Sequence, residues 1–392
     1  MKILAVNAGS SSMKFQLFDM PSENVLVSSA FERIGLDNSF YSIKVNDKKI
    51  KKEVALNNHE EAVHLFLQEL LDNGVVSSLD EIGAAGHRIV HGFDKYTQAV
   101  IADETVINDI ESFSSLAPLH NPAHVLGIRA VKVSLPAATN VVVFDTAFHQ
   151  TMEKEAFIYP VPYEWYTEYA VRRYGFHGIS HEYVSDRISE IVNSKTFRAI
   201  ICHLGNGGSI TAVENGKCVE TSMGVTPLAG IPMGTRCGDI DPSIIDYIMR
   251  RTGKTIGEVM IDLNKKSGLL GVSGISSDSR DIEDAINNGN ERALLAQKIY
   301  VRKIASFIAS YYVILGGVDV IAFTAAIGEN SIMTRKDIMN ALVSLGVKID
   351  EQANDVRGVE RLISSPDSKI KCYIIPTNEE LMMARETYNI SK

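Results

Sequence analysis

The segment at residues 7–14 (NAGSSSMK) constrains the fold most, because it joins two stretches that both have strand patterns. Residues 3–6 are apolar, and the residues from Phe15 to Phe18 alternate between apolar and polar. A turn of glycine and serines can bring backbone N–H groups and hydroxyls, here those of Ser10 and Ser12, close to an anionic oxygen, and Lys14 adds a positive charge. The usual phosphate loop opens directly into a helix, whereas a second strand follows here. The sequence therefore predicts a phosphate-binding β-hairpin, with an ordinary hairpin turn as the alternative.

A weak internal repeat of this hairpin pattern indicates a duplicated domain. Residues 199–213 again read as an apolar strand, an Asn/Gly/Ser turn and a second strand. A further strand at residues 318–323 leads into residues 324–330 and a helix, where backbone N–H groups could meet phosphate or ribose. Strand-length runs alternate with helical patterns, which favours an α/β fold. We expect two halves that meet at a cleft, with a boundary soon after the strand at residues 140–144.

The clearest helix is predicted at residues 60–72, where apolar side chains recur at spacings of three and four and Asn73-Gly74 supplies a stop. An apolar stretch at residues 304–318 is too short to span a bilayer, which needs roughly 20 residues, and is interpreted as a buried helix. The other predicted helices lie at residues 122–133, 182–192, 243–251, 282–288, 291–315 and 335–345.

The composition indicates an ordinary globular protein and limits its partners. The chain has 392 residues and a formal net charge of −9, which argues against nucleic acid or an anionic membrane as a partner. Any anionic substrate must then be held by local cations or a metal. Four scattered cysteines and the lack of a signal-peptide pattern before the first strand predict a disulfide-free protein in the cytoplasm.

Two arginines in apolar or glycine-rich surroundings are candidate anion-binding groups. Arg88 lies in GHRIVHG and Arg236 in a glycine-rich loop, residues 227–242. A buried guanidinium needs an anionic partner, so Arg88 either binds substrate or forms a structural salt bridge. Two forked arginines at one site would suit a carboxylate and a phosphoryl group.

Three further segments contain residues that could carry chemistry. Asp145 stands at the tip of a buried-looking strand, where it is either a helix cap or a site acid. His177 and His181 have the spacing of zinc ligands, but no Glu follows the first histidine and Gly178 weakens a helix, which disfavours zinc. Glu379 follows a strand and could reach Mg²⁺, although an acid at a helix N-terminus would have the same sequence.

Taken together, these segments resemble the acetate kinase family, which belongs to the superfamily of sugar kinases, actin and heat-shock ATPases. The resemblance implies an α/β fold of two duplicated ribonuclease H-like (actin-like ATPase) domains with an interdomain cleft. It places an N-terminal domain at residues 1–147, to which a C-terminal helix at 381–392 returns, and a nucleotide-binding domain at 148–380. The motifs that carry it, in order, are NAGSSS with Lys14, GHRIVHG, APLHNP, FDTAFH, RRYGFHGISH, HLGNGGS, MGTRCGDIDP, DSRD, AIGENS and IPTNEEL.

The resemblance also implies reversible, metal-dependent transfer of the ATP γ-phosphoryl group to acetate, in a homodimer that uses Mg²⁺ or Mn²⁺. Asp145, His177 and Arg236 match the family's catalytic positions, and Asn7 and Glu379 match its magnesium positions. The positions that match acetate binding are Arg88, Val90, Leu119, His120, Phe176 and Pro227. The positions that match nucleotide binding are Lys14, Ser10, Ser12, His203, Leu204, Gly205, Asn206, Gly207, Asp278, Ser279, Arg280, Ala326, Ile327, Gly328, Glu329 and Asn330.

The chain departs from the usual family pattern at Phe93 and Ala326, where glycine is usual, at Ala229, where glutamate is common, and at Cys237, where serine is usual. A methyl group at Ala326 could alter nucleotide preference, and Phe93 could reshape the pocket mouth. Two alternatives stay open at this point. Propionate or butyrate kinase would share this motif set, and a nucleotide-binding switch ATPase would hydrolyse ATP without an acyl acceptor.

Overall fold

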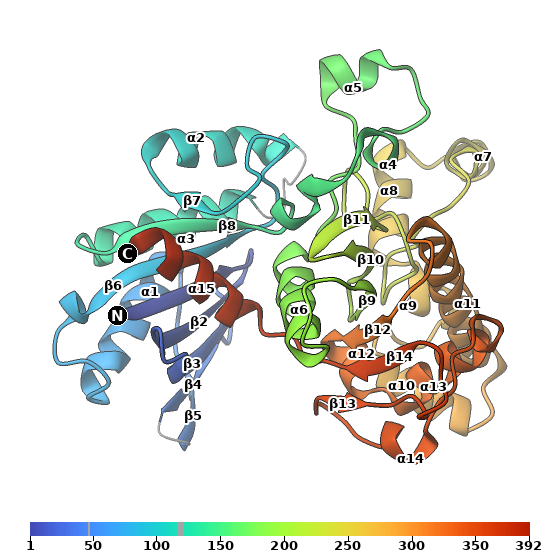
Figure 1. Ribbon diagram of the computed structural model, residues 1–392. Helices are drawn as coiled ribbons and strands as arrows, with labels where there is room; N and C mark the ends of the chain where they lie inside the picture. Colours follow the sequence, from blue (N-terminus) through green and yellow to red (C-terminus); the bar gives the residue numbers. More distant parts are fainter. Residues whose placement is uncertain (46–47, 116–120) are drawn as a thin grey trace. The chain divides into compact units, whose positions relative to one another are not determined.

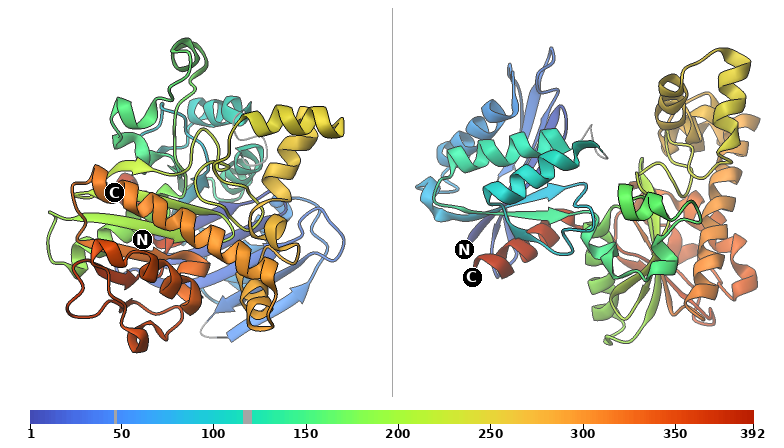
Figure 2. Two further views of the ribbon diagram at one scale, coloured as in Figure 1. Left: turned by 90° about the vertical axis from the view of Figure 1, so that its right-hand side faces the viewer. Right: turned by 90° about the horizontal axis from the view of Figure 1, so that it is seen from above.

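The computed structural model describes residues 1–45, 48–115 and 121–392, and these divide into two compact units. Unit 1 comprises residues 1–148 and 378–392, and unit 2 comprises residues 149–377. Each unit is built around its own sheet (Figures 1 and 2). We propose that the two units are the two domains of the chain.

The sheet of unit 1 combines an antiparallel meander with parallel strands, in the order β5-β4-β3-β2-β1-β6-β8-β7. The strands β1 and β2 pair antiparallel with Asn7 opposite Lys14, so the predicted hairpin is confirmed. β1 then runs parallel to β6, and β6 parallel to β8. The bounds are β1 (Lys2–Ala8), β2 (Ser12–Asp19), β3 (Asn24–Glu32), β4 (Phe40–Val45), β5 (Lys48–Glu53), β6 (Ile82–Ile89), β7 (Val100–Ile101) and β8 (Thr139–Phe144).

Helices cover both faces of this sheet. α1 (His59–Asp72) and α3 (Asn121–Ser134) pack together on one face, and α15 (Glu379–Ser391) packs on the other face against β1, β6 and β8 (Figure 2). The Asn58 side chain caps α1, and Gly74, with φ +65°, follows its end as predicted. Phe66 of α1 stacks on Phe15 of β2 with ring centroids 4.5 Å apart. α2 (Glu104–Ser112) completes this unit.

The close approach of α15 to the sheet depends on one glycine. A Cβ at Gly86 of β6 would stand 2.2 Å from Oγ1 of Thr387, which a real side chain cannot do. This contact fixes the C-terminal helix against the strand that carries Arg88.

The sheet of unit 2 repeats the scheme of unit 1, in the order β11-β10-β9-β12-β14-β13. β9 and β10 form the second predicted hairpin, and β9, β12 and β14 are parallel. Each sheet therefore contains a three-stranded antiparallel meander, and the first strand of that meander is followed in the sheet by two strands parallel to it. The fold is a duplicated actin-like ATPase fold. The bounds are β9 (Arg198–Leu204), β10 (Gly208–Glu214), β11 (Lys217–Thr221), β12 (Val320–Thr324), β13 (Arg361–Leu362) and β14 (Lys371–Ile374).

In unit 2, α6 lies on one face of the sheet and α11 on the other (Figure 2). Residues 304–314 of the predicted apolar segment lie within α11, and no helix of the described residues is long and apolar enough to cross a membrane. The helices are α4 (Lys154–Phe157), α5 (Glu164–Tyr169), α6 (Gly178–Ile191), α7 (Ser243–Thr252), α8 (Ile256–Lys265), α9 (Gly268–Ser273), α10 (Ser279–Asn287), α11 (Glu291–Ile314), α12 (Ala325–Asn330), α13 (Ile332–Ala341) and α14 (Glu351–Asn354). Short 3₁₀ turns occur at Leu79–Glu81, Phe113–Ser115, Ala147–Thr151 and Val343–Leu345.

Three helices begin two or three residues earlier than the sequence predicted, because polar caps precede their apolar pattern. Asp278, Ser331 and Asn378 accept backbone N–H bonds at the starts of α10, α13 and α15. α6 begins at Gly178, four residues before its predicted start at 182, directly after His177 with φ +59°. Gly178 thus stands at the first position of α6 and not in its interior, where the low helix propensity of glycine costs most.

Candidate active site

In unit 1, the predicted site residues stand at the carboxyl ends of three neighbouring parallel strands. Asn7 lies near the end of β1, Arg88 near the end of β6, and Asp145 directly after β8. Nε of Arg88 donates to Oδ1 of Asp145 at 3.0 Å, and Nη2 donates to Oδ2 at 2.8 Å. The carboxyl ends of parallel strands are the usual ligand-binding edge of an open α/β sheet.

Glu379 completes this group as the first residue of α15. Its carboxylate lies 3.6 Å from Nη1 of Arg88, and its side chain is 16% exposed. Burial raises the pKa of Glu379, Arg88 opposes that shift, and Asp145 adds to it. For Arg88, burial lowers the pKa but the two carboxylates outweigh it and raise it. One guanidinium thus balances two acids, of which Glu379 also complements the N-terminal dipole of α15.

The oxygen donors of Asn7, Asp145 and Glu379 fit a hard divalent cation such as Mg²⁺. The described residues hold no cluster of three or more His, Cys, Asp or Glu ligands. A metal here would therefore keep water and substrate oxygens in its coordination shell, as Mg²⁺ usually does.

The hairpin turn between β1 and β2 is held by hydrogen bonds on both sides. The Gly9 N–H donates to the Ser12 carbonyl at 2.7 Å, and Nε2 of His59 bonds to the Gly9 carbonyl at 2.7 Å. Ser10 and Lys14 are exposed. Ser11 and Ser12 are half-buried. The turn is thus a fixed loop that exposes the Ser10 hydroxyl and the Lys14 ammonium group.

In unit 2, His177 and Arg236 converge on Gly207, in the turn between β9 and β10. A Cβ at Gly207 would stand 3.4 Å from Nε2 of His177 and 3.4 Å from Nη1 of Arg236. His177 also stacks on His203 of β9, with ring centroids 4.1 Å apart. The lack of a side chain at Gly207 therefore leaves room beside a ring nitrogen and a guanidinium.

Arg236 has no carboxylate within 4.0 Å among the residues that the structure describes. Its Nη1 donates to the Pro227 carbonyl at 3.3 Å and contacts Sδ of Met233 at 3.8 Å. The side chain is half-buried, and burial lowers its pKa. A cation in this setting is stabilised by an anionic ligand, because it has lost water without gaining an acid.

A cavity of about 660 Å³ brings together three of the predicted nucleotide segments within unit 2. Its walls come from the β9–β10 turn, the start of α10 and α12, together with residues that the sequence did not single out. It is lined by Asn206, Ser277, Asp278, Ser279, Arg280, Glu283, Ala326, Ile327, Asn330, Ser331 and Arg357.

Two acids at this cavity already have partners. Asp278 caps α10 and bonds the Arg280 guanidinium, which lowers the pKa of Asp278 to about 2. The Ser331 hydroxyl donates to Glu283. Arg357 donates to the Asn330 carbonyl at 2.6 Å. Of the charged groups that line the cavity, Arg357 is the cation that has no acid partner among the described residues.

The other predicted residues do not line this cavity. His203 and Leu204 are buried on β9, and Glu329 accepts the Thr377 N–H at 3.1 Å while burial raises its pKa. Gly205, Gly207 and Gly328 adjoin the lining residues in sequence.

The predicted acetate residues are only partly described. Val90 and Pro227 are half-buried and Phe176 is buried, whereas Leu119 and His120 lie outside the described residues. Among the departures from the family pattern, Phe93 has φ +54°, a conformation that favours the usual glycine. Its ring packs on Phe113, with centroids 4.5 Å apart.

Ala326 is exposed, lines the cavity and does not have a positive φ. The backbone therefore does not require glycine at this position. Any effect of the methyl group would act through the shape of the cavity.

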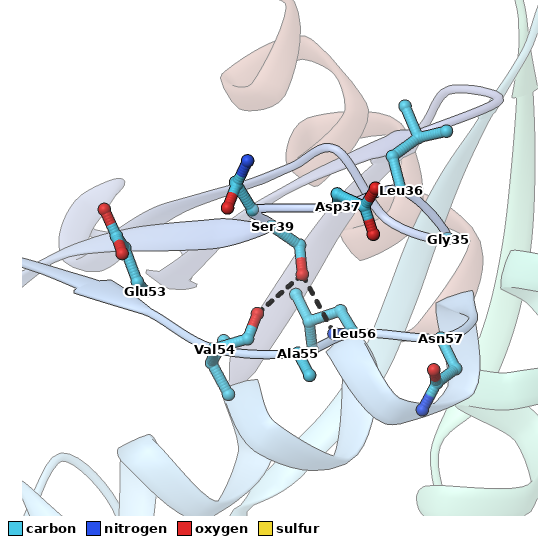
Figure 3. Close-up of a pocket in the computed structure, with 10 residues that line it drawn as sticks. Gly35, Leu36, Asp37, Ser39, Glu53, Val54, Ala55, Leu56 and Asn57 are labelled. Carbon is cyan, nitrogen blue, oxygen red and sulfur yellow. Dashed lines mark hydrogen bonds between the residues drawn. The ribbon is translucent and has the colours of Figure 1, made fainter.

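A second cavity, of about 610 Å³, lies in unit 1 between residues 35–39 and 53–57 (Figure 3). Ser39 joins its two walls, since Oγ donates to the Val54 carbonyl at 2.6 Å and accepts the Leu56 N–H at 2.9 Å. None of the described site residues lines this cavity. We assign no role to it.

Sequence reasoning missed four residues of the 660 Å³ cavity: Ser277, Glu283, Ser331 and Arg357. Ser277 directly precedes the DSRD motif, and Ser331 ends AIGENS, so proximity to a motif could have found both. Glu283 and Arg357 carry no local signal, because only the packing of α10 and of the segment after α14 brings them to the cavity.

The repeated sheet topology, with a cavity of this kind and unpaired cations in unit 2, defines a phosphotransferase of the actin-like ATPase fold. The sequence model of the Acetokinase family matches residues 2–385, so the chain belongs to this family. An acetate kinase of Geobacillus sp. (strain WCH70) is 52% identical over 392 residues, which cover 100% of this chain and 99% of that protein.

Two solved structures are similar over nearly the whole chain. The acetate kinase of Porphyromonas gingivalis has a TM-score of 0.95 and 43% identity, and covers 100% of both chains. A propionate kinase from Francisella tularensis subsp. tularensis SCHU S4 has a TM-score of 0.94 and 41% identity, with 99% of both chains covered.

Proposed function

We propose that this enzyme transfers the γ-phosphoryl group of ATP reversibly to acetate, giving acetyl phosphate and ADP. The observation that carries the proposal is the half-buried Arg236, which has no acid partner among the described residues and lies beside His177 at Gly207. Asn206, the residue before Gly207, lines the 660 Å³ cavity, so an anion at Gly207 would adjoin a ligand in that cavity.

We propose that the cavity binds the nucleoside part of ATP. Ala326 and Ile327 offer apolar surface for a base, and the guanidinium groups of Arg280 and Arg357 can stack on or hydrogen-bond to it. The phosphates would then extend past Asn206 toward Gly207. Lys14, Ser10 and Ser12 of the hairpin in unit 1 are proposed phosphate contacts.

We propose that Arg88 binds the acetate carboxylate. Asp145 holds the guanidinium in a fixed plane by two hydrogen bonds. Acetate is already ionised near neutral pH, so Asp145 need not remove a proton. Val90, Leu119, Phe176 and Pro227 are proposed neighbours of the acetate methyl group, with His120 beside them.

Phosphoryl transfer requires no covalent bond between the protein and the substrates, so the protein contributes positioning and electrostatic stabilisation. An acetate oxygen attacks the γ-phosphorus, the bond to the β-phosphate oxygen breaks, and ADP leaves with the electron pair. Arg236 and His177 are proposed to stabilise the charge on the equatorial oxygens.

Mg²⁺, or Mn²⁺ in its place, would neutralise phosphate charge when bound through Asn7 and Glu379, with Asp145 nearby. Rates measured with EDTA and after Mg²⁺ is added back test this part of the proposal.

The oligomeric state and the cellular location are also proposals. We infer a homodimer that works in the cytoplasm. All four cysteines are free, in accord with a reducing compartment. The dimer is supported by α7, whose residues are all described: none of them is buried, and the apolar side chains of Ile244 and Tyr247 are exposed. Sedimentation of the purified chain tests the dimer.

Propionate is the second candidate acceptor, because the similar structure from Francisella tularensis is named a propionate kinase. One extra methylene changes binding in an apolar pocket by only about 1–3 kcal/mol, so overlap between the two acids is expected.

The test is the initial rate of acyl hydroxamate formation with acetate, propionate and butyrate, beside ATP without an acid. We expect the highest kcat/KM with acetate. A higher kcat/KM with propionate would reassign the acceptor, and hydrolysis of ATP at an equal rate without any acid would support a switch ATPase.

A further inference from the structure

A buried serine bridges two histidines behind the proposed phosphoryl site. Oγ of Ser209 lies 2.9 Å from Nδ1 of His177 and 2.7 Å from Nε2 of His181. Ser209 is on β10, while His177 directly precedes α6 and His181 lies in its first turn. Ser209 and His181 are both fully buried.

The Ser209 hydroxyl has one proton, so it can donate a hydrogen bond to only one of the two histidines. In one arrangement Ser209 donates to His181, and the His181 proton then sits on Nδ1. In the other arrangement His181 donates from Nε2, and Ser209 is free to donate to His177.

The surroundings of His181 decide between them. Its Nδ1 is buried and has no hydrogen-bond partner among the described residues. A buried N–H without an acceptor costs about 1–3 kcal/mol, and orphaned N–H groups are rarer than orphaned acceptors. The proton of His181 therefore belongs on Nε2. Burial, and then His149 and His203, lower the pKa of His181 well below its ordinary value, which excludes a second proton.

We infer that Ser209 is a positioning residue that accepts from His181 and donates to Nδ1 of His177, so that His177 is neutral and carries its proton on Nε2. That nitrogen is the one that would stand 3.4 Å from a Cβ at Gly207, beside Nη1 of Arg236. The site thus presents one neutral N–H donor and one cation to a phosphoryl oxygen, rather than two cations.

This inference deepens the proposed function, on which the role of His177 rests, but its first test does not use activity. Long-range ¹H–¹⁵N NMR spectra of the full chain at pH 7.5 report which ring nitrogen of each histidine is protonated, with His177 assigned from a His177→Asn sample. We expect the Nε2–H form for His177. The Nδ1–H form, or the imidazolium, would overturn the inference whether or not the enzyme uses acetate.

The variant test compares two buried serines. Ser209→Ala should give a mixture of His177 tautomers and lower kcat about tenfold with KM for ATP nearly unchanged, the size of one lost hydrogen bond to the reacting group. Ser185→Ala is the matched control, because Ser185 is buried on α6 and its hydroxyl has no partner among the described residues. It should change neither readout. A fall in kcat for Ser209→Ala without a change of the His177 tautomer would contradict the inference and indicate a packing effect.

Discussion

Nη1 of Arg335 donates to the carbonyl of Gly328 at 3.0 Å, inside the core of unit 2. The guanidinium is fully buried, and its remaining bonds go to Oδ1 and the carbonyl of Asn354 and to the carbonyl of Val356. Burial lowers the pKa of Arg335 to about 10. One side chain therefore ties α12 to the segment that carries Arg357 to the cavity.

Replacing this arginine should destabilise the protein. Arg335→Met would remove the guanidinium donor from four oxygens, of which the Asn354 carbonyl keeps the Val356 N–H. Each buried oxygen left without a donor costs about 1–3 kcal/mol, so we expect a loss of about 3 kcal/mol or more in the free energy of unfolding. Chemical denaturation measures it, with Arg250→Met on exposed α7 as the control. A loss below about 1 kcal/mol would show that water or neighbouring groups replace the guanidinium.

Arg236 should be important for turnover rather than for binding of either substrate alone. Arg236→Leu should lower kcat by about 10³ or more, as for other arginines that stabilise a transferring phosphoryl group. Arg250→Leu should leave kcat unchanged, since this residue is 74% exposed. If kcat of Arg236→Leu stays within about tenfold of wild type at saturating substrates, Arg236 does not have this role.

Arg88 should instead affect acetate. Arg88→Lys keeps the charge opposite Asp145 and Glu379 but loses the planar two-point geometry. We expect KM for acetate to rise about tenfold or more, with KM for ATP within about twofold. Arg129→Lys, an exposed pair with Glu104, is the control. A larger change in KM for ATP than for acetate would contradict the assignment.

A buried histidine should make the protein sensitive to acid. His87 is 3% exposed and donates from Nε2 to Oδ1 of Asn140 at 2.8 Å, and burial lowers the pKa of His87 to about 4. Between that value and the unfolded pKa of about 6.5, the unfolded chain binds more protons than the folded chain. The free energy of unfolding therefore rises with pH across this window and is lost as pH falls through it.

The effect can be isolated with His87→Gln. Between pH 7 and pH 5, this variant should lose about 2 kcal/mol less of its free energy of unfolding than wild type loses. His64→Gln, at an exposed histidine of α1, should behave like wild type. Equal losses in wild type and His87→Gln would contradict the lowered pKa.

The sequence predicted the parts of the fold that have local signals. The strand patterns on either side of residues 7–14 and 205–207 identified both hairpins, and the apolar spacing with Asn73-Gly74 identified α1. The starts of α10, α13 and α15 were missed, because Asp278, Ser331 and Asn378 act as caps only through side-chain bonds that a periodic pattern does not contain.

The site was predictable only where the family motifs lie. Arg88, Asp145 and Glu379 were found separately, but the sequence left open whether Arg88 binds substrate or an acid, and the structure places it on both carboxylates. The contacts of Arg335 and the position of Arg357 at the cavity depend on packing between segments that are distant in the sequence, so no local pattern predicts them. The Ser209 bridge depends on the register of β10 against α6, which no local pattern specifies.

The most direct test of the central claim is a ³¹P NMR time course of the purified chain with ATP, Mg²⁺ and acetate. We predict an acetyl phosphate signal that grows with ADP, needs acetate, and reverts to ATP when ADP is added in excess. Release of inorganic phosphate at the same rate with and without acetate, with no acetyl phosphate signal, would contradict the account.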